Sequence, residues 1–194
     1  MTLPRSICVY CGSNRGRSAS YAELARRLGE ELARRGIRLV YGGGRVGLMG
    51  ILADAVLAGG GEVLGVIPGA LDRREVGHRG LTERVVVTTM HERKRTMFER
   101  SEAFIALPGG FGTFDEIIEM ITWRQLTMHF RPVILLNHAG YFDGLLAQIR
   151  RGVEEGFIAA PHAAIPYAAR DVAGCFEYLG AFESPEVPDH QRWF

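Results

Sequence analysis

The chain is almost devoid of lysine, poor in cysteine and free of long hydrophobic runs. Lys94 is its only lysine, against 22 arginines, a ratio that a genome biased toward arginine codons accounts for. No apolar run approaches the roughly 20 residues that a membrane span requires. The net charge is +1, without a basic stripe or interleaved aromatic residues, which argues against nucleic acid as the main partner. The partner we expect is a small molecule.

The cysteines and histidines show no pattern of a metal or redox site. Cys8 and Cys11 are spaced as C-x-x-C, but they lie in the first expected strand, where residues three apart point to opposite faces. With Cys175 far away and no signal peptide, the cysteines indicate a reduced, cytoplasmic protein. Histidines other than His91 lack metal-ligand spacing and are expected on the surface or as hydrogen-bonded core residues. We therefore expect neither a metal nor a cofactor.

Apolar periodicity alternates between that of strands and that of helices along the chain. With 47% hydrophobic and 23% charged residues, the chain suits one domain, residues 1–183, followed by an extended tail, residues 184–194. The alternation predicts an α/β fold, a single-domain Rossmann-like doubly wound parallel sheet with helices on both faces. Residues 68–83 are expected to form a loop that is long enough to serve as a lid over the site. The expected strands are residues 6–11, 37–41, 62–67, 84–88, 103–107 and 132–136, and the expected helices are 18–35, 47–59, 90–101, 113–127, 142–155 and one near 171–182.

The segment PGGFGTFDE, residues 108–116, is the most informative part of the sequence. It follows an apolar run typical of a buried strand and opens a segment with helical periodicity, so it forms a strand–loop–helix turn. Gly109, Gly110 and Gly112 allow positive φ and close approach to a ligand, and the free N–H groups of the new helix favour an anion. The turn is therefore expected to bind phosphate, with Glu116 one helical turn away.

The same residues also allow a structural interpretation. Thr113 and Glu116 have the spacing of a capping box, in which the threonine caps the helix and the glutamate bonds back to the cap's N–H. From this motif alone, cap and catalytic carboxylate are equally good interpretations of Glu116. Thr89 and Glu92, in the segment TTMHERK, have the same spacing at another helix start.

The segment TTMHERK shifts the balance toward catalysis. In a parallel sheet, it and the glycine turn would open at the carboxyl edge of neighbouring strands, where open α/β folds bind their ligands. Arg93 and Lys94 would then face the same crevice as Glu116. A single lysine placed there, despite the arginine bias, is a modest further hint of function.

A third turn, YGGGRVGLMG at residues 41–50, suggests a rival function. Gly42, Gly44 and Gly47 satisfy the G-x-G-x-x-G fingerprint of dinucleotide-binding enzymes. The acidic residue that should accompany it, Glu62, precedes an apolar strand and so belongs at the amino edge of the sheet, away from any ribose. The fingerprint also follows the second strand instead of the first. We interpret it as a second ligand-binding loop and not as an NAD site.

Taken together, these segments resemble the LONELY GUY (LOG) family, the cytokinin riboside 5′-monophosphate phosphoribohydrolases long labelled possible lysine decarboxylases. The resemblance extends over nearly the whole chain, and MHxRK with PGGxGTxxE is specific as a pair. Asp115 is a departure, because the family often carries glutamate there, with the same charge. The matching motifs are CVYCGS at 8–13, YGGGRVGLMG at 41–50, MHERK at 90–94, PGGFGTFDE at 108–116, WRQL at 123–126 and RPVILLN at 131–137.

The resemblance implies hydrolysis of the N-glycosidic bond of cytokinin riboside 5′-monophosphates, and of AMP as well, to the free base and ribose 5-phosphate. Arg93 and Glu116 would be the catalytic pair. Both stand at helix starts expected to be exposed, so replacing either should leave the fold intact. The residues expected to bind the nucleotide are Ser13, whose hydroxyl could equally cap the helix that follows it, Gly43, Gly44, Met90, Lys94, Gly109, Gly110, Gly112 and Thr113.

This reaction fits the chemistry of the residues. Breaking the bond builds positive charge on the ribose, which a carboxylate stabilises. Glu116 would hold the ribose hydroxyls or orient the attacking water, and Arg93 would stabilise or protonate the leaving base, or fix the phosphate. Glu119 would be a supporting partner on the same helix face or a solvated side chain.

The resemblance, together with the apolar face of the helix carrying Ile117, Ile121 and Trp123, also leads us to expect a homodimer or higher oligomer with pockets near the interface. A non-catalytic nucleotide sensor remains an alternative, as does the oxidoreductase. Lysine decarboxylation has poor support, because a pyridoxal enzyme needs a Schiff-base lysine and Lys94 is the sole candidate.

Overall fold

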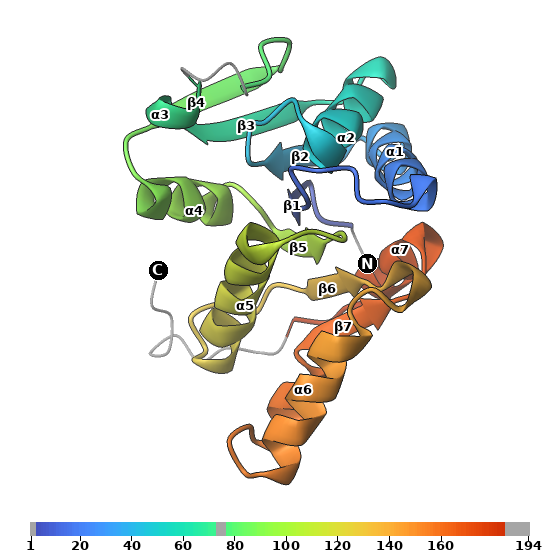
Figure 1. Ribbon diagram of the computed structural model, residues 1–194, viewed down its shortest axis with the longest axis vertical. Helices are drawn as coiled ribbons and strands as arrows, with labels where there is room; N and C mark the ends of the chain where they lie inside the picture. Colours follow the sequence, from blue (N-terminus) through green and yellow to red (C-terminus); the bar gives the residue numbers. More distant parts are fainter. Residues whose placement is uncertain (1–2, 73–76, 185–194) are drawn as a thin grey trace.

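The alternating strands form one seven-stranded parallel sheet between two layers of helices (Figure 1), as a computed structural model of residues 3–72 and 77–184 shows. The predicted doubly wound α/β fold is therefore confirmed. The strands, in their order across the sheet, are β4 (Glu83–Val87), β3 (Val63–Pro68), β2 (Arg38–Tyr41), β1 (Ser6–Tyr10), β5 (Ala103–Ala106), β6 (Val133–Leu136) and β7 (Pro166–Ala169).

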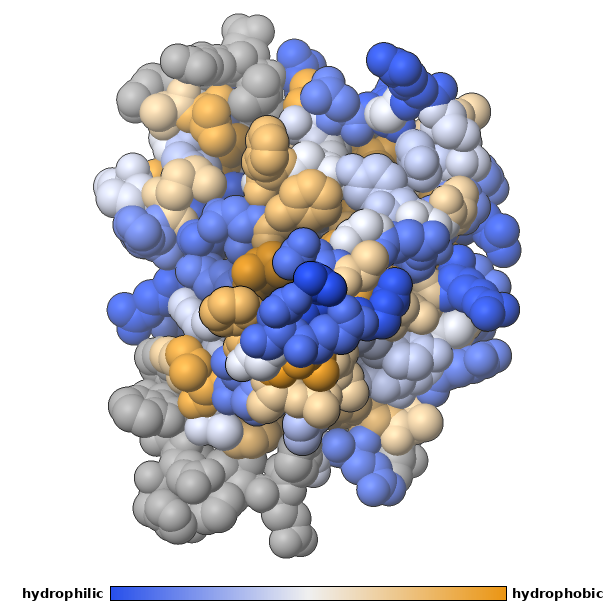
Figure 2. All heavy atoms as spheres, turned by 60° about the horizontal axis from the view of Figure 1, so that its bottom comes forward, coloured by the Kyte–Doolittle hydropathy of each residue, from blue (hydrophilic) through white to orange (hydrophobic). Residues whose placement is uncertain are grey.

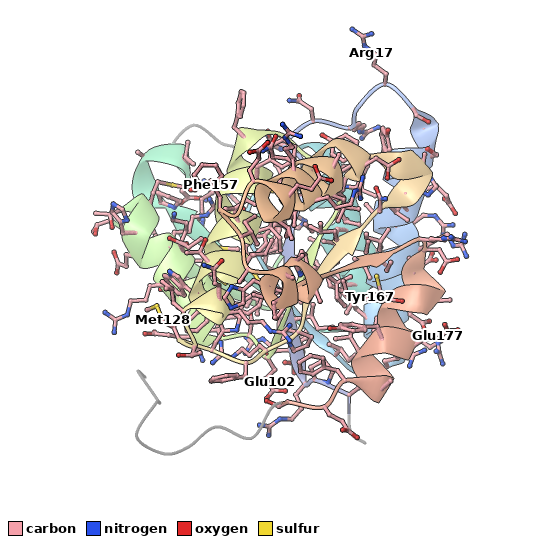
Figure 3. All side chains as sticks on the ribbon, turned by 90° about the horizontal axis from the view of Figure 1, so that it is seen from below. Arg17, Glu102, Met128, Phe157, Tyr167 and Glu177 are labelled. Atoms are coloured by element: carbon pink, nitrogen blue, oxygen red, sulfur yellow. The ribbon has the colours of Figure 1, made fainter. Side chains whose placement is uncertain are left out.

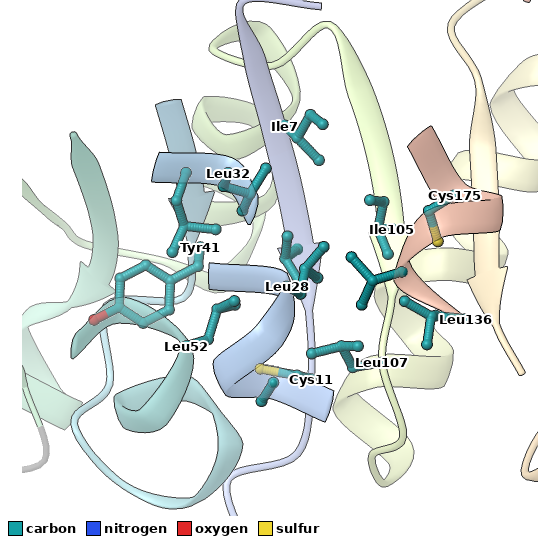
Figure 4. Packing of buried hydrophobic residues seen from close by; sticks show 14 of the residues in the cluster. Ile7, Cys11, Leu28, Leu32, Tyr41, Leu52, Ile105, Leu107, Leu136 and Cys175 are labelled. Atoms are coloured by element: carbon teal, nitrogen blue, oxygen red, sulfur yellow. The ribbon is translucent and has the colours of Figure 1, made fainter. Parts of the chain in front are cut away.

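The helices cover both faces of the sheet because successive residues of a strand point in opposite directions. One face packs against α1 (Ala19–Arg34), α2 (Gly47–Ala58) and α7 (Val172–Ala181), and the other packs against α4 (Met90–Glu99), α5 (Phe111–Gln125) and α6 (Asp143–Glu154). Figure 4 shows the first of these cores, in which Leu28, Leu32 and Leu52 contact the sheet. The remaining helical turns are α3 (Gly69–Leu71), η2 (His138–Gly140) and η3 (Ala160–Ala164).

The cysteines behave as the strand pattern predicts. Cys8 lies in the core under α4 and α5, whereas Cys11 lies in the core under α1 and α2, so the two side chains are on opposite sides of the sheet. Both, like Cys175, are buried free thiols. His129 is one of the predicted core histidines: Nε2 donates to the Met120 carbonyl at 2.9 Å, and Nδ1 accepts from the Arg131 N–H at 3.1 Å.

The strand order corrects one expectation about the site. β4 lies at the edge of the sheet, and β3, β2 and β1 separate it from β5, so the turns after β4 and β5 do not follow neighbouring strands. They still meet, because α4 runs from β4 back over the sheet to reach β5 (Figure 1). β5 pairs with β1 on the side opposite β2, which makes the β1–β5 boundary the switch point where such folds bind ligands.

One strand and the start of one helix also differ from the sequence-based expectation. β7 was not predicted, because it is four residues long, starts with a proline and contains small alanines instead of β-branched residues. α5 begins at Phe111 with Gly110 as its N-cap, two residues before the expected start. The predicted tail falls almost wholly on residues 185–194, which lie outside the described residues.

The segment predicted as a lid is held against the rest of the protein at His78. Within residues 68–83, α3 forms the first part, and residues 73–76 lie outside the described residues. The N–H of His78 donates to the Gly43 carbonyl at 2.8 Å, and His78 Nε2 lies 2.9 Å from Asp54 Oδ1. This part of the segment is therefore held against the glycine turn that follows β2.

The surface mixes residue types. On the face shown in Figure 2, hydrophobic residues form small groups between hydrophilic ones. None of the helices in the described ranges combines the length and hydrophobicity needed to cross a membrane.

The close packing of α1 on α2 yields a prediction about stability. A Cβ at Gly29 would lie 2.7 Å from both the Ala55 Cβ and the Leu52 carbonyl oxygen. Although alanine normally favours a helix interior, Gly29→Ala should lower the free energy of unfolding by about 1–3 kcal/mol through overpacking. Gly144→Ala in α6 is the matched control, because nothing lies within 4 Å of its added Cβ. Denaturant unfolding of both variants measures the difference, and an unchanged or raised stability of Gly29→Ala would contradict this packing.

Candidate functional site

Three turns meet at the carboxyl edge of the sheet. The N–H of Gly12, after β1, donates to the carbonyl of Pro108, after β5, at 3.1 Å, and the Gly12 carbonyl accepts from Leu48 N–H at 3.0 Å. Gly47 has φ +63°, and a Cβ there would collide with the backbone of Ser13. The predicted phosphate turns are thus packed directly against one another, which requires glycine at these contacts.

The start of α5 is the turn expected to bind an anion, but its glycines work differently from the prediction. None of Gly109, Gly110 and Gly112 has positive φ. Gly109 is required for close packing, because a Cβ would collide with the Thr113 hydroxyl and the Gly12 amide nitrogen. The N-cap, Gly110, has no side chain to bond the first amides of α5, and a helix start without a side-chain cap is a typical place for an anion to bind.

The capping-box interpretation of Glu116 is wrong. α5 starts at Phe111, so Thr113 lies within its first turn, where its side chain is buried. The corresponding cap at α4 is real: Thr89 Oγ1 accepts from the Glu92 N–H at 3.1 Å. The Glu92 carboxylate reaches one residue further back than a standard box and accepts from the Thr88 N–H at 2.8 Å.

A pocket of about 290 Å³ opens at the switch point between β1 and β5. It contains three of the predicted binding residues, Ser13, Gly109 and Gly110. Arg17, on the same loop after β1, projects away from the molecule (Figure 3) and is not among the lining residues. The rest of the lining is Gly12, Asn14, Arg15, Gly16, Tyr21, Leu48, Pro108 and Tyr141.

Arg93 and Glu116 form a nearly buried ion pair. Arg93 Nη1 lies 3.1 Å from Glu116 Oε1, and the two side chains are only 11% and 9% exposed. Arg93 Nε donates to the Val66 carbonyl at 3.1 Å, and Nη2 donates to the Gly42 carbonyl at 3.4 Å. A Cβ at Gly42 would occupy the place of the guanidinium. The expectation that both residues are exposed is therefore wrong.

Burial sets the charge of Glu116. Removal from water raises the pKa of Glu116 from 4.5 to about 6, because the opposing attraction of Arg93 offsets only part of the desolvation and the negative charge of Asp115 adds to it. At neutral pH the group is mainly a carboxylate in a poorly solvated place. A charge held in this way interacts strongly with a cation that develops beside it.

Lys94 lies on the side of α4 that faces α5. Its Nζ lies 3.1 Å from Glu119 Oε1 and 3.3 Å from Asp115 Oδ2, and its side chain is 14% exposed. Burial alone would lower the pKa of Lys94, but hydrogen bonds and charge from Glu119 and Asp115 outweigh it and raise the pKa. Lys94 and Glu119 thus join the two helices that carry Arg93 and Glu116.

The other predicted binding residues are more scattered. Gly43 and Gly44 are buried, and Gly44 forms an isolated bridge with Gly77. Met90 is exposed at the first position of α4, and Gly112 is exposed in the first turn of α5.

Sequence analysis missed Arg15, Tyr21 and Tyr141, which line the pocket. For Tyr141 a signal existed, because it follows β6 at the same edge of the sheet as the glycine turns.

The rival dinucleotide site finds no support. Glu62 lies just before β3 at the amino edge, 67% exposed, with its carboxylate 3.9 Å from Arg38 Nε. Within residues 3–72 and 77–184, no group of three or more histidine, cysteine, aspartate or glutamate side chains is arranged to hold a metal ion.

Comparison with known proteins identifies the family. Residues 49–179 match the family described as "Possible lysine decarboxylase". The chain is 56% identical to the probable cytokinin riboside 5′-monophosphate phosphoribohydrolase LOGL1 of Oryza sativa subsp. japonica over 154 residues, 79% of this chain and 69% of that protein. It is 50% identical to the cytokinin riboside 5′-monophosphate phosphoribohydrolase LOG of the same plant over 191 residues, 96% of this chain and 79% of that protein.

A solved structure shares the fold. The molybdenum cofactor binding protein of Rippkaea orientalis superimposes with a TM-score of 0.69 at 23% identity, over 93% of this chain and 98% of that one. At this identity the likeness shows the fold alone. The family match and the plant relatives carry the identification: the chain belongs to the LOG family, the family described as possible lysine decarboxylase.

Proposed function

We propose that the protein hydrolyses the N-glycosidic bond of cytokinin riboside 5′-monophosphates, and of AMP, to the free base and ribose 5-phosphate. The observation that carries the proposal is the buried Arg93–Glu116 pair beside an uncapped helix start at the switch point of the sheet. The names of the plant relatives, phosphoribohydrolases of this substrate class, support it. Residues 1–183 would form the catalytic domain.

The phosphate binds at the start of α5 in this proposal. The N–H groups of residues 111–113 and the helix dipole favour an anion there, and Ser13 lines the same pocket as Gly109 and Gly110. At about 1.5 Å per residue, Glu116 lies roughly 7–8 Å along the helix from Phe111. This separation suits a nucleotide whose phosphate is held at the helix start and whose ribose reaches the carboxylate.

Glu116 acts on the ribose. As the bond between C1′ and the base nitrogen breaks, the electron pair leaves with the base and positive charge develops on the sugar. The poorly solvated carboxylate stabilises this charge, and it either holds the ribose hydroxyls or orients the water whose oxygen bonds to C1′. Below pH about 6 the carboxylate becomes protonated, and this stabilisation declines.

Arg93 positions Glu116. Its guanidinium is held by two main-chain carbonyls and the carboxylate, so its direction is determined by β2 and β3. A remaining N–H is available for the leaving base, which gains negative charge. Lysine decarboxylation is disfavoured, because the Lys94 ammonium is held by two carboxylates and a Schiff base requires the neutral amine.

We propose further that the protein works as a homodimer in the cytoplasm. The buried free thiols support a reducing location. The apolar face expected to form the interface does not, because Ile117 is fully buried and Trp123 packs against Phe98 with ring centroids 4.9 Å apart. Exposed apolar side chains along α4 and α5 support an interface on these two helices instead, and these are Met90, Phe111, Ile118 and Leu126, the C-cap of α5.

Replacing the ion pair tests the catalytic proposal. Glu116→Gln should lower the turnover of AMP by at least about a thousandfold, because the amide lacks the negative charge. Its far-UV circular dichroism should match that of the wild type, because the amide has the same shape as the carboxylate. Arg93→Ala should also abolish turnover, and it should cost about 3–5 kcal/mol of stability because it leaves a buried carboxylate unpaired. Assays of free base release measure both. An active Glu116→Gln enzyme would exclude the proposed role.

The pH dependence of stability tests separately whether Glu116 carries a buried charge in the folded protein. The folded pKa of Glu116, about 6, exceeds its ordinary value of 4.5. Its contribution to stability is thus fully present below pH about 4.5 and is lost as the pH rises through about 6. Between pH 4.5 and pH 8, the wild type should lose about 2 kcal/mol relative to Glu116→Gln. Parallel pH profiles would show that Glu116 does not carry a buried charge.

The form of the substrate gives a second test. AMP should release adenine and ribose 5-phosphate, whereas adenosine should be nearly inert, because binding energy from the phosphate is used at the glycosidic bond. Removing the phosphate should therefore lower kcat as well as raise KM. Chromatography that separates base from nucleotide measures both reactions. Comparable turnover of the two compounds would reject the phosphate role of the α5 start.

The assembly is tested by mass. Light scattering at micromolar concentration should give twice the 21.4 kDa of the chain. Ile118→Asp should shift the mass to that of a monomer, since it places a charge on the proposed interface. Phe157→Asp is the matched control, because Phe157 is 88% exposed and follows the end of α6, on neither α4 nor α5. A monomeric wild type would overturn the dimer.

A further inference from the structure

Tyr141 lies on a turn whose shape is strongly constrained. The Asn137 side chain accepts from the Phe142 N–H and donates to Asp143 Oδ1, both at 2.7 Å. Between these anchors, Ala139 has φ 53°, a left-handed conformation that is unfavourable for a residue with a Cβ. The turn that follows β6 thus holds a strained backbone in a fixed shape.

This turn brings the Tyr141 ring to the pocket between β1 and β5. Tyr141 is one of the lining residues, and its hydroxyl donates a hydrogen bond to the Gly109 carbonyl. Its ring also packs edge-on against Tyr21 at 5.8 Å between centroids and against Phe142 at 5.1 Å. The hydroxyl therefore reaches the first glycine of the phosphate turn from a separate element of the fold.

The bond determines where the next N–H points. In a trans peptide, the carbonyl of Gly109 and the N–H of Gly110 point in opposite directions. Gly109 is packed against Thr113 and Gly12, but nothing lies within 4 Å of a Cβ built on Gly110, so packing restrains this peptide only at its Gly109 end. A glycine peptide that packing restrains at one end only can turn its carbonyl toward the ligand, and a carbonyl oxygen repels an anion.

We infer that Tyr141 is a positioning residue for phosphate: its hydroxyl holds the Gly109–Gly110 peptide with the carbonyl turned away from the anion and the N–H turned toward it. The inference rests on the proposed function, since it concerns the phosphate of that substrate. It adds to the site a residue from the turn after β6, outside the glycine turns and the Arg93–Glu116 pair.

Tyr167 on β7 provides a control outside the pocket. It is 38% exposed, and its ring stacks on Tyr178 with centroids 4.0 Å apart. Among the described residues, its hydroxyl makes no hydrogen bond to the protein. Tyr167→Phe and Tyr141→Phe therefore each remove one phenol hydroxyl, and only the second removes a bond to the phosphate turn.

The test measures binding of ribose 5-phosphate, the phosphate-bearing product, by calorimetric titration of the full chain. Tyr141→Phe should weaken this binding about five- to tenfold, the effect of one lost hydrogen bond, whereas Tyr167→Phe should change it less than twofold. Inhibition of AMP turnover by adenine, which lacks a phosphate, should stay within twofold of the wild type in both variants. Melting temperatures report whether either variant disturbs the fold.

The outcomes separate this inference from the proposed function. If the wild type cleaves AMP and Tyr141→Phe binds ribose 5-phosphate as tightly as Tyr167→Phe does, the inference is wrong and the function stands. Equal weakening toward adenine and ribose 5-phosphate would also overturn it, because a general disturbance of the pocket would then explain the loss. If the wild type does not cleave AMP, the proposed function fails, and the titrations still decide the role of Tyr141. A wild type that does not bind ribose 5-phosphate overturns the inference.

Discussion

The arrangement of the site depends on one guanidinium group. Arg93 donates to the main-chain carbonyls of Gly42, just after β2, and Val66, within β3, and its third nitrogen contacts the carboxylate on α5. A buried carboxylate is costly to desolvate unless a charged partner compensates it. Without Arg93, Glu116 would be driven to its neutral form or out of the site. Glycine at position 42 and the path of α4 across the sheet both follow from the space and position that this group needs.

The glycine turns meet a second constraint, which is that main-chain donors must face the ligand. Where a Cβ at Gly47 would meet the backbone of Ser13, and one at Gly109 would meet Gly12, the turns are packed backbone to backbone. Such packing places glycines, which have no side chains, in the lining of the pocket next to the start of α5. The tyrosine hydroxyl on the Gly109 carbonyl complements this arrangement, because it occupies the acceptor that would otherwise oppose an anion.

The sequence predicts what local patterns control. Strand and helix periodicity, the cap at Thr89 and the opposite directions of Cys8 and Cys11 all depend on residues within a few positions of one another. The separation of β4 from β5, the burial of Arg93 and the inward direction of Ile117 depend on how distant elements pack. Periodicity identifies the apolar face of α5, but it does not show whether the sheet or a second subunit covers that face. The contact between Tyr141 and Gly109 spans 32 positions of sequence, and no local pattern encodes it.

The fold itself leaves the chemistry open. A protein that binds the molybdenum cofactor has the same architecture at 23% identity, so the sheet and its switch point are compatible with more than one ligand. The proposed function therefore depends on the side chains placed on this scaffold: a helix start that would bind phosphate, and a carboxylate roughly 7–8 Å along α5 from it. In that proposal, the helix start alone would bind a nucleotide without changing it, since phosphate binding is the same before and after the bond breaks. The buried carboxylate would respond to charge that exists only while the bond breaks. We therefore propose that the step from a binding protein to a hydrolase lies in the pairing of Glu116 with Arg93.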